Sequence, residues 1–243
     1  MLPEFTEPLF VAIGIAAAAG MMRGFAGVGS GMLMAPFFVH IFGPVETVGI
    51  IILIEIVATA QLLPSVRREI YWPTIAPMGL AAAACMPVGS WLLVSLKTTS
   101  LQFGVSLLVA LSAVALLTGW RYEGRKPLAA TLGVGMISGL LMALTSLGNP
   151  PVMLYLLSSR DAAATNRANF TAYFALTLVA LIVMMMVNGL ITAQVAGTAA
   201  VLLPGFLATT WIGSRLFRKS NEALYRRVAL GILLCAGVYG MSL

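Results

Sequence analysis

Gly27-Val28-Gly29-Ser30-Gly31 interrupts an apolar tract that runs from about residue 9 to residue 42. As one straight helix this tract would measure about 45–50 Å, against a hydrocarbon core of about 30 Å. A second long tract, about residues 128–158, is interrupted by Ser146-Leu147-Gly148-Asn149-Pro150-Pro151. Because glycine and proline weaken or break helices, each tract is predicted to be a helix, an unwound break and a half-helix.

The composition around these breaks is that of a membrane protein. Of 243 residues, 60% are hydrophobic, and only 14 Lys and Arg and 8 Asp and Glu carry charge. The mean hydropathy is +1.00, whereas a soluble domain has about a quarter of its residues charged. Most soluble enzymes are therefore excluded, and membrane lipid is an expected partner. Further predicted spans lie at about 49–64, 74–96, 101–120, 168–187, 192–213 and 225–243.

The basic residues predict how the chain crosses the membrane. If each broken tract crosses and returns, the chain has ten segments; if each tract crosses once, it has eight. The positive-inside rule favours ten segments, because 12 of the 14 basic residues then share the cytoplasmic side. They are Arg67, Arg68, Arg121, Arg125, Lys126, Arg160, Arg167, Arg215, Arg218, Lys219, Arg226 and Arg227.

The chain also contains a weak internal repeat. With an offset of 119 residues, Gly20 falls on Gly139 and Gly29 on Gly148; further along, the offset grows to 124 and Gly89 falls on Gly213. This predicts an all-α polytopic fold with a first transmembrane repeat at 1–120, a cytoplasmic linker at 121–127 and a second repeat at 128–243. With five segments in each half the repeats are inverted; with four they would be parallel.

Matching interrupted segments in two repeats indicate a transporter binding site. A half-helix that begins inside the bilayer presents free N–H groups and the positive end of its dipole, which together favour an anion. Close helix packing is the alternative explanation for each glycine alone. The predicted substrate-binding residues are Arg23, Gly27, Gly29, Ser30, Gly31, Thr145, Ser146, Gly148, Asn149, Asn169 and Tyr173.

Ionisable residues inside apolar runs add candidates for coupling or gating. Glu55 lies within a predicted span, where a carboxylate is costly and is a functional candidate by default. It could carry a coupling proton, and Gln61 could share its cavity. Arg23 is predicted either to hold the anion through paired hydrogen bonds or to reach the lipid headgroups. Arg167 is predicted to act as a gate or as a positive-inside anchor.

The two breaks resemble the TauE/SafE family of sulfite-exporter-like permeases. The first signature is Gly20-Met-Met-Arg-Gly-Phe-Ala-Gly-Val-Gly-Ser-Gly-Met-Leu-Met-Ala-Pro36, and the second runs from Ser138-Gly139 to Pro150-Pro-Val-Met-Leu-Tyr-Leu-Leu157. The second is similar to a subgroup of organosulfonate permeases. The resemblance implies a permease of bacterial inner membranes for sulfur-containing or organic anions, with the glycine-rich turns at its site. Arg23, Ser30 and Asn149 depart from the family pattern.

The predicted function is a secondary transporter of sulfite, a sulfonate or a related small anion, working by alternating access. A coupling proton or cation is an open partner. An intramembrane enzyme and a non-transporting membrane subunit are the alternatives. The enzyme lacks a recognisable catalytic arrangement, because neither a His-Glu-x-x-His motif nor a rhomboid-type serine motif is present. No cofactor, metal or nucleic acid is expected, and the oligomeric state and transport direction are not predicted.

Overall fold

The structure is a computed structural model, which describes residues 7–95, 127–145, 149–158, 161–187, 189–221, 223–225, 227–228 and 231. The described part of the chain is helical, which confirms the predicted all-α class. The predicted span 101–120 and most of 225–243 lie outside the described residues. The helices are α1 (Glu7–Ala26), α2 (Ser30–Phe42), α3 (Pro44–Val66), α4 (Trp72–Ser95), α6 (Leu128–Thr145), α7 (Asn149–Leu157), α8 (Ala163–Val187) and α9 (Ala193–Lys219).

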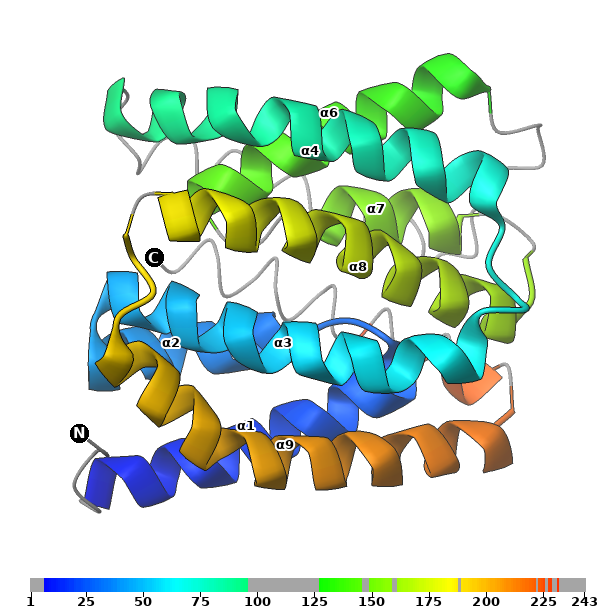
Figure 1. The fold of residues 1–243 in the computed structure, drawn as a ribbon. Helices are drawn as coiled ribbons and strands as arrows, with labels where there is room; N and C mark the ends of the chain where they lie inside the picture. The colour runs from blue at the N-terminus through cyan, green and yellow to red at the C-terminus, as the bar shows by residue number, and fades with distance from the viewer. Residues whose placement is uncertain are drawn as a thin grey trace. The chain divides into compact units, whose positions relative to one another are not determined.

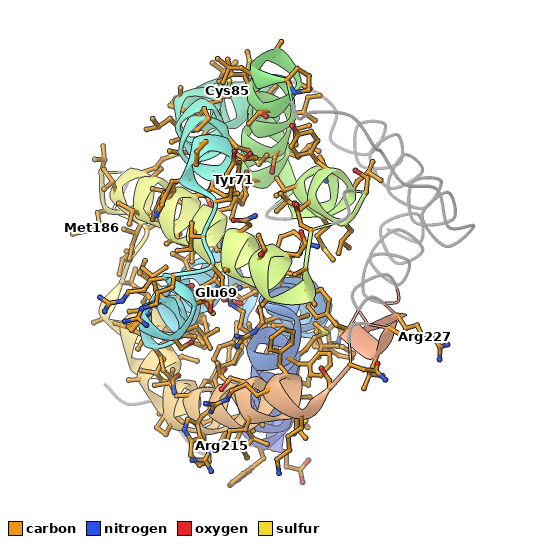
Figure 2. The ribbon with its side chains drawn as sticks, turned by 90° about the vertical axis from the view of Figure 1, so that its right-hand side faces the viewer. Glu69, Tyr71, Cys85, Met186, Arg215 and Arg227 are labelled. Carbon is orange, nitrogen blue, oxygen red and sulfur yellow. The ribbon has the colours of Figure 1, made fainter. Side chains whose placement is uncertain are left out.

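Four of the described helices contain stretches that are long and apolar enough to cross a membrane. They also carry exposed apolar side chains such as Met186, which points away from its helix in Figure 2 and is 66% exposed. Such side chains suit a lipid environment. The chain is therefore an integral membrane protein. The four stretches are Glu7–Ala26, Glu46–Val66, Ala163–Val187 and Ala193–Lys219.

The chain forms two compact units that are discontinuous in sequence. The first consists of Met1–Ser65 and Leu178–Ser220, and the second of Val66–Thr177 and Asn221–Leu243. The first unit therefore holds α1, α2, α3 and α9, while the second holds α4, α6, α7 and most of α8. The first unit thus takes α9 from the second half of the sequence, and the second unit takes α4 from the first half.

In the first unit the chain reverses direction twice after α1. It runs along α1, returns along α2 and turns again into α3 (Figure 1). Buried apolar side chains from α1, α2, α3 and α9 form one core, including Ala16, Phe38, Ile54 and Phe206. At about 1.5 Å per residue the 13 residues of α2 span about 20 Å. Helix α2 is therefore a half-length helix that returns beside α1.

Helices α1 and α9 pack through glycine. A Cβ atom at Gly20 would meet the carbonyl oxygen of Phe206, and one at Gly24 would meet that of Thr210. Because these pairs rise together in residue number, α1 and α9 run parallel. From the other side of the contact, a Cβ atom at Gly213 would meet the carbonyl oxygen of Met21. The two backbones touch where side chains would otherwise separate them.

In the second unit, α4 and α6 pack through glycine in the same way. A Cβ atom at Gly139 would meet the carbonyl oxygen of Ala82, and one at Gly89 would lie 2.7 Å from that of Leu140. Here too the chain reverses, from α6 into α7 and again into α8 (Figure 1). The hydroxyls of Thr131 on α6 and Tyr155 on α7 are 2.7 Å apart, which holds the start of α6 beside the end of α7.

Candidate functional site

The break between α1 and α2 is built on two glycines. Gly27 and Gly29 have φ values of 77° and 99°, in a region that residues with a side chain rarely adopt. Helix α1 closes with a hydrogen bond from Gly27 N to Arg23 O, and Leu33 N bonds to Gly29 O at the start of α2. The first backbone N–H groups of α2, from Ser30 onward, precede this bond and have no partner within their own helix.

A buried ion pair lies beside this break. Arg23 on α1 and Glu55 on α3 are 0% and 2% exposed, and Arg23 Nε lies 3.0 Å from Glu55 Oε2. Taking two charges out of water costs several kcal/mol per ion. The attraction between the charges offsets that cost only where further hydrogen bonds satisfy the remaining donors and acceptors.

Those further hydrogen bonds connect the ion pair to the break itself. Arg23 Nη1 donates to the carbonyl oxygen of Gly27, and Arg23 Nη2 donates to Thr59 Oγ1 at 2.7 Å. The hydroxyl of Ser30, the first residue of α2, donates to Glu55 Oε1. We call Arg23, Gly27, Ser30, Glu55 and Thr59 the break cluster. It joins the end of α1, the start of α2 and the middle of α3 within the first unit.

The break cluster combines an arginine with a carboxylate in a water-excluded interior. A guanidinium matches the geometry of an oxyanion through paired N–H donors, and here its counter-ion is Glu55. The arrangement can therefore hold an anion only by changing what Arg23 contacts. The structure brings together four predicted residues, which are Arg23, Gly27, Ser30 and Glu55. Burial of Arg23 at 0% exposure does not suit a side chain that reaches the headgroups.

Two other predicted residues of the first half differ in position: Gly31 lies beside the break cluster, and Gln61 lies away from it. Gly31 is in the first turn of α2, where an added Cβ atom would lie 3.7 Å from Ile51 of α3. Gln61 is exposed, because six residues at 100° each turn it about 120° away from Glu55 on α3. The structure therefore does not bring Gln61 into the cluster. Thr59, which sequence analysis missed, could have been found from its position one turn after Glu55.

The second break is described only at its edges. Helix α6 ends at Thr145 and α7 begins at Asn149. Residues 146–148, which include Ser146 and Gly148, lie outside the described residues, as do the side chains of Thr145 and Asn149. Their assignment to a binding site stays a prediction.

The predicted residues of α8 are buried in the second unit. Asn169 Oδ1 accepts a hydrogen bond of 2.8 Å from Tyr71 N. The Tyr173 hydroxyl donates to Ser138 Oγ of α6 at 2.7 Å. Arg167 is 4% exposed and interacts electrostatically with Tyr225. Burial of Arg167 fits an internal contact better than an anchor at the headgroups.

Arg215, near the end of α9, shows the contrasting environment of an interfacial arginine. It extends away from the helices in Figure 2, and its Cζ lies 3.6 Å from the centre of the Trp211 ring. Both side chains are exposed. Arginine and tryptophan are typical of the membrane interface, so Arg215 is a suitable control for buried Arg23.

The fold and the break cluster are those of a helical membrane protein with a broken helix and ionisable groups inside its apolar interior, which are features that membrane transporters share. The model of the family "Sulfite exporter TauE/SafE" matches residues 12–240, and the chain belongs to this family. The expected resemblance is confirmed.

A similar curated protein is the "Probable sulfite/organosulfonate exporter TauE" of Cupriavidus necator. It is 24% identical over 247 residues, which cover 98% of this chain and 95% of that protein. No solved structure matches the chain. Family and relative together support a membrane transporter.

Proposed function

We propose that the chain is a secondary transporter that moves a small sulfur-containing anion across the bacterial inner membrane by alternating access. Sulfite and organosulfonates are the proposed substrates, because the family and the Cupriavidus necator relative carry these anions in their names. The observation that carries the proposal is the break cluster. It places Arg23 and the N-terminal end of α2 together in a buried, apolar interior.

We place the substrate at this cluster for an electrostatic reason. The N-terminus of a helix attracts anions through its free N–H groups and dipole, and broken helices do so in other transporters. Arg23 adds a guanidinium within the same cluster, where its charge is paired with that of Glu55. Ser146, Gly148 and Asn149 are the proposed counterparts at the second break. Gln61 is not included, because it faces away from Glu55.

We further propose that residues 1–120 and 128–243 are inverted repeats joined by the linker 121–127. Two observations support this. The chain reverses at both breaks (Figure 1), as a tract that crosses and returns must do. The contact of Gly20 with Phe206 also corresponds to that of Gly139 with Ala82. The residue numbers of the two glycines differ by 119, and those of their two partners differ by 124. These are the two offsets of the sequence repeat.

Flux into liposomes tests the proposed function. Purified protein is reconstituted, and uptake of radiolabelled sulfite and methanesulfonate is measured. We expect saturable uptake of at least one anion, which Arg23→Gln and Gly29→Leu abolish. Arg215→Gln and Gly14→Leu, at exposed positions of the same unit, are the matched controls and are expected to transport normally.

Each outcome of this assay has a distinct meaning. Wild-type protein without anion flux would overturn the transport proposal. Folded Arg23→Gln and Gly29→Leu variants with normal flux would overturn the placement of the site at the break cluster and leave transport intact.

A further inference from the structure

We propose that the transported anion replaces Glu55 as the counter-ion of Arg23, and that Glu55 takes up one proton as this happens. The carrier would thereby be an electroneutral symporter of one proton with one monovalent anion. This inference rests on the proposed function and adds to it the coupling ion, the stoichiometry and the residue that carries the proton. It begins from the ion pair of 3.0 Å between Arg23 Nε and Glu55 Oε2.

The charges around the break cluster make this exchange necessary. Among the described residues of the first unit, Arg23 and Glu55 are the two buried charged side chains. The other side chains of this cluster, those of Ser30 and Thr59, are hydroxyls that do not titrate in the physiological range. The charged or titratable side chains elsewhere on α1, α2, α3 and α9 are exposed: Glu7, His40, Glu46, Arg215, Arg218 and Lys219.

Counting charge in each state then selects the coupling. With no substrate, Arg23 and Glu55 cancel and the net charge is zero. An anion bound without a proton gives −1, and a proton bound without an anion gives +1. An uncompensated buried charge is strongly unfavourable. With both bound, Arg23 pairs with the anion, Glu55 is neutral and the net charge is again zero.

The hydrogen bonds of the break cluster allow the empty state and the state with both anion and proton bound to interconvert. Neutral Glu55 keeps an oxygen that can accept from Ser30, so the start of α2 retains its contact with α3. Arg23 keeps its bonds to Gly27 O and Thr59 Oγ1, and the incoming oxyanion takes the place of Glu55 Oε2 beside Arg23 Nε. The proton enters Glu55 from the same aqueous side as the anion and leaves with it on the other side.

The variant Glu55→Gln separates the movement of the anion from the movement of the proton. Glutamine preserves the shape of the side chain and an acceptor for Ser30 but carries no charge. The loaded state, Arg23 with its anion, is still neutral, whereas the empty state has lost the Glu55 charge that balances Arg23. The variant is therefore expected to exchange anion for anion across the membrane but to lose net uptake.

The experiment uses full-length protein in liposomes with methanesulfonate, which remains a monoanion at every pH used, and with sulfite in parallel. In wild-type vesicles, an inward proton gradient of one pH unit should raise methanesulfonate accumulation about tenfold. An electrical potential alone should not change accumulation, and an internal pH indicator should report proton entry with the anion.

The matched control is Glu46→Gln, which changes an exposed glutamate at the start of the same helix. It should retain both exchange and the response to the proton gradient. Glu55→Gln should keep exchange within about threefold of wild type and lose the tenfold response. Arg23→Gln should lose both activities.

Two results would overturn the inference while leaving the proposed function intact. One is wild-type uptake that a proton gradient does not change. This result would exclude proton coupling even if the Glu55→Gln variant fails to fold. The other is a folded Glu55→Gln variant that keeps gradient-driven accumulation or that loses exchange as well. If wild-type protein carries neither anion, the proposed function itself fails.

Discussion

At the scale of single residues, the break cluster shows why a charged pair persists in an apolar interior. Arg23 satisfies the carbonyl of Gly27 where α1 ends, and Glu55 accepts from Ser30 where α2 begins. A helix end buried without such partners would leave backbone and side-chain groups unsatisfied. The pair therefore also stabilises the break that the two glycines permit.

Removing one partner of this pair should destabilise the protein more than removing both. We expect Arg23→Met or Glu55→Leu alone to lower the free energy of unfolding by about 3–5 kcal/mol, because each leaves a buried charge without its counter-ion. The double variant should lie closer to wild type than either single variant. Unfolding in mixed detergent micelles measures this, with exposed Arg215→Met as the control. Single variants as stable as wild type would show that the ion pair contributes little.

At the scale of helices, glycine decides which helices touch. Helix α1 contacts α9 through Gly20 and Gly24, and α6 contacts α4 through Gly139. Close backbone approach gains van der Waals contact, which matters within a membrane because lipid offers helices no hydrophobic reason to associate. Other glycines of the same helices, such as Gly14 and Gly133, have no atom within 4 Å of an added Cβ.

This difference predicts a matched set of alanine variants. Gly20→Ala and Gly139→Ala should each cost about 1–3 kcal/mol of stability, because a methyl group forces the paired backbones apart. Gly14→Ala and Gly133→Ala should change stability by less than about 1 kcal/mol. Thermal unfolding of the four purified variants measures the difference. Equal effects at both kinds of position would contradict the packing assignment.

Part of the helical architecture followed from sequence, and the packing partners did not. Hydropathy and the glycines predicted the helices and the interruption at Gly27 and Gly29, because both depend on local residues. Arg23 and Glu55 were each identified as ionisable residues inside apolar runs, but their pairing depends on how α1 packs beside α3. The Ser138–Tyr173 hydrogen bond was missed for the same reason, since serine and tyrosine in apolar runs are common and only packing shows which of them meet.

At the scale of the whole molecule, the basic residues and the reversals of the chain both indicate how many times the chain crosses the membrane. Arg67 and Arg68 follow α3, and Arg218 and Lys219 end α9. If each broken tract returns, these two groups lie on one side of the membrane; if each tract crosses once, they lie on opposite sides. The positive-inside rule and the reversal after α1 both favour the arrangement in which the two basic groups lie on the same side of the membrane.

Single cysteines test this topology. In a background with Cys85 and Cys235 replaced by alanine, cysteines at Arg68 and Lys219 should react with a membrane-impermeant thiol reagent from the same side. A cysteine at Gln194, exposed at the start of α9, should react from the opposite side. Reaction of the Arg68 and Lys219 positions from different sides would exclude the inverted arrangement.

The pairing of α1 with α9 also has a consequence for how the protein is made. Helix α1 ends at Ala26, whereas α9 begins at Ala193. At a synthesis rate of about 5–20 residues per second, α1 leaves the ribosome roughly 10–30 s before its partner exists. Through that interval the glycine face of α1 must rest against lipid or an insertion factor. Assembly of the first unit is therefore one of the last events of biogenesis, and a truncated chain lacking α9 would leave α1 unpaired and exposed to membrane quality control.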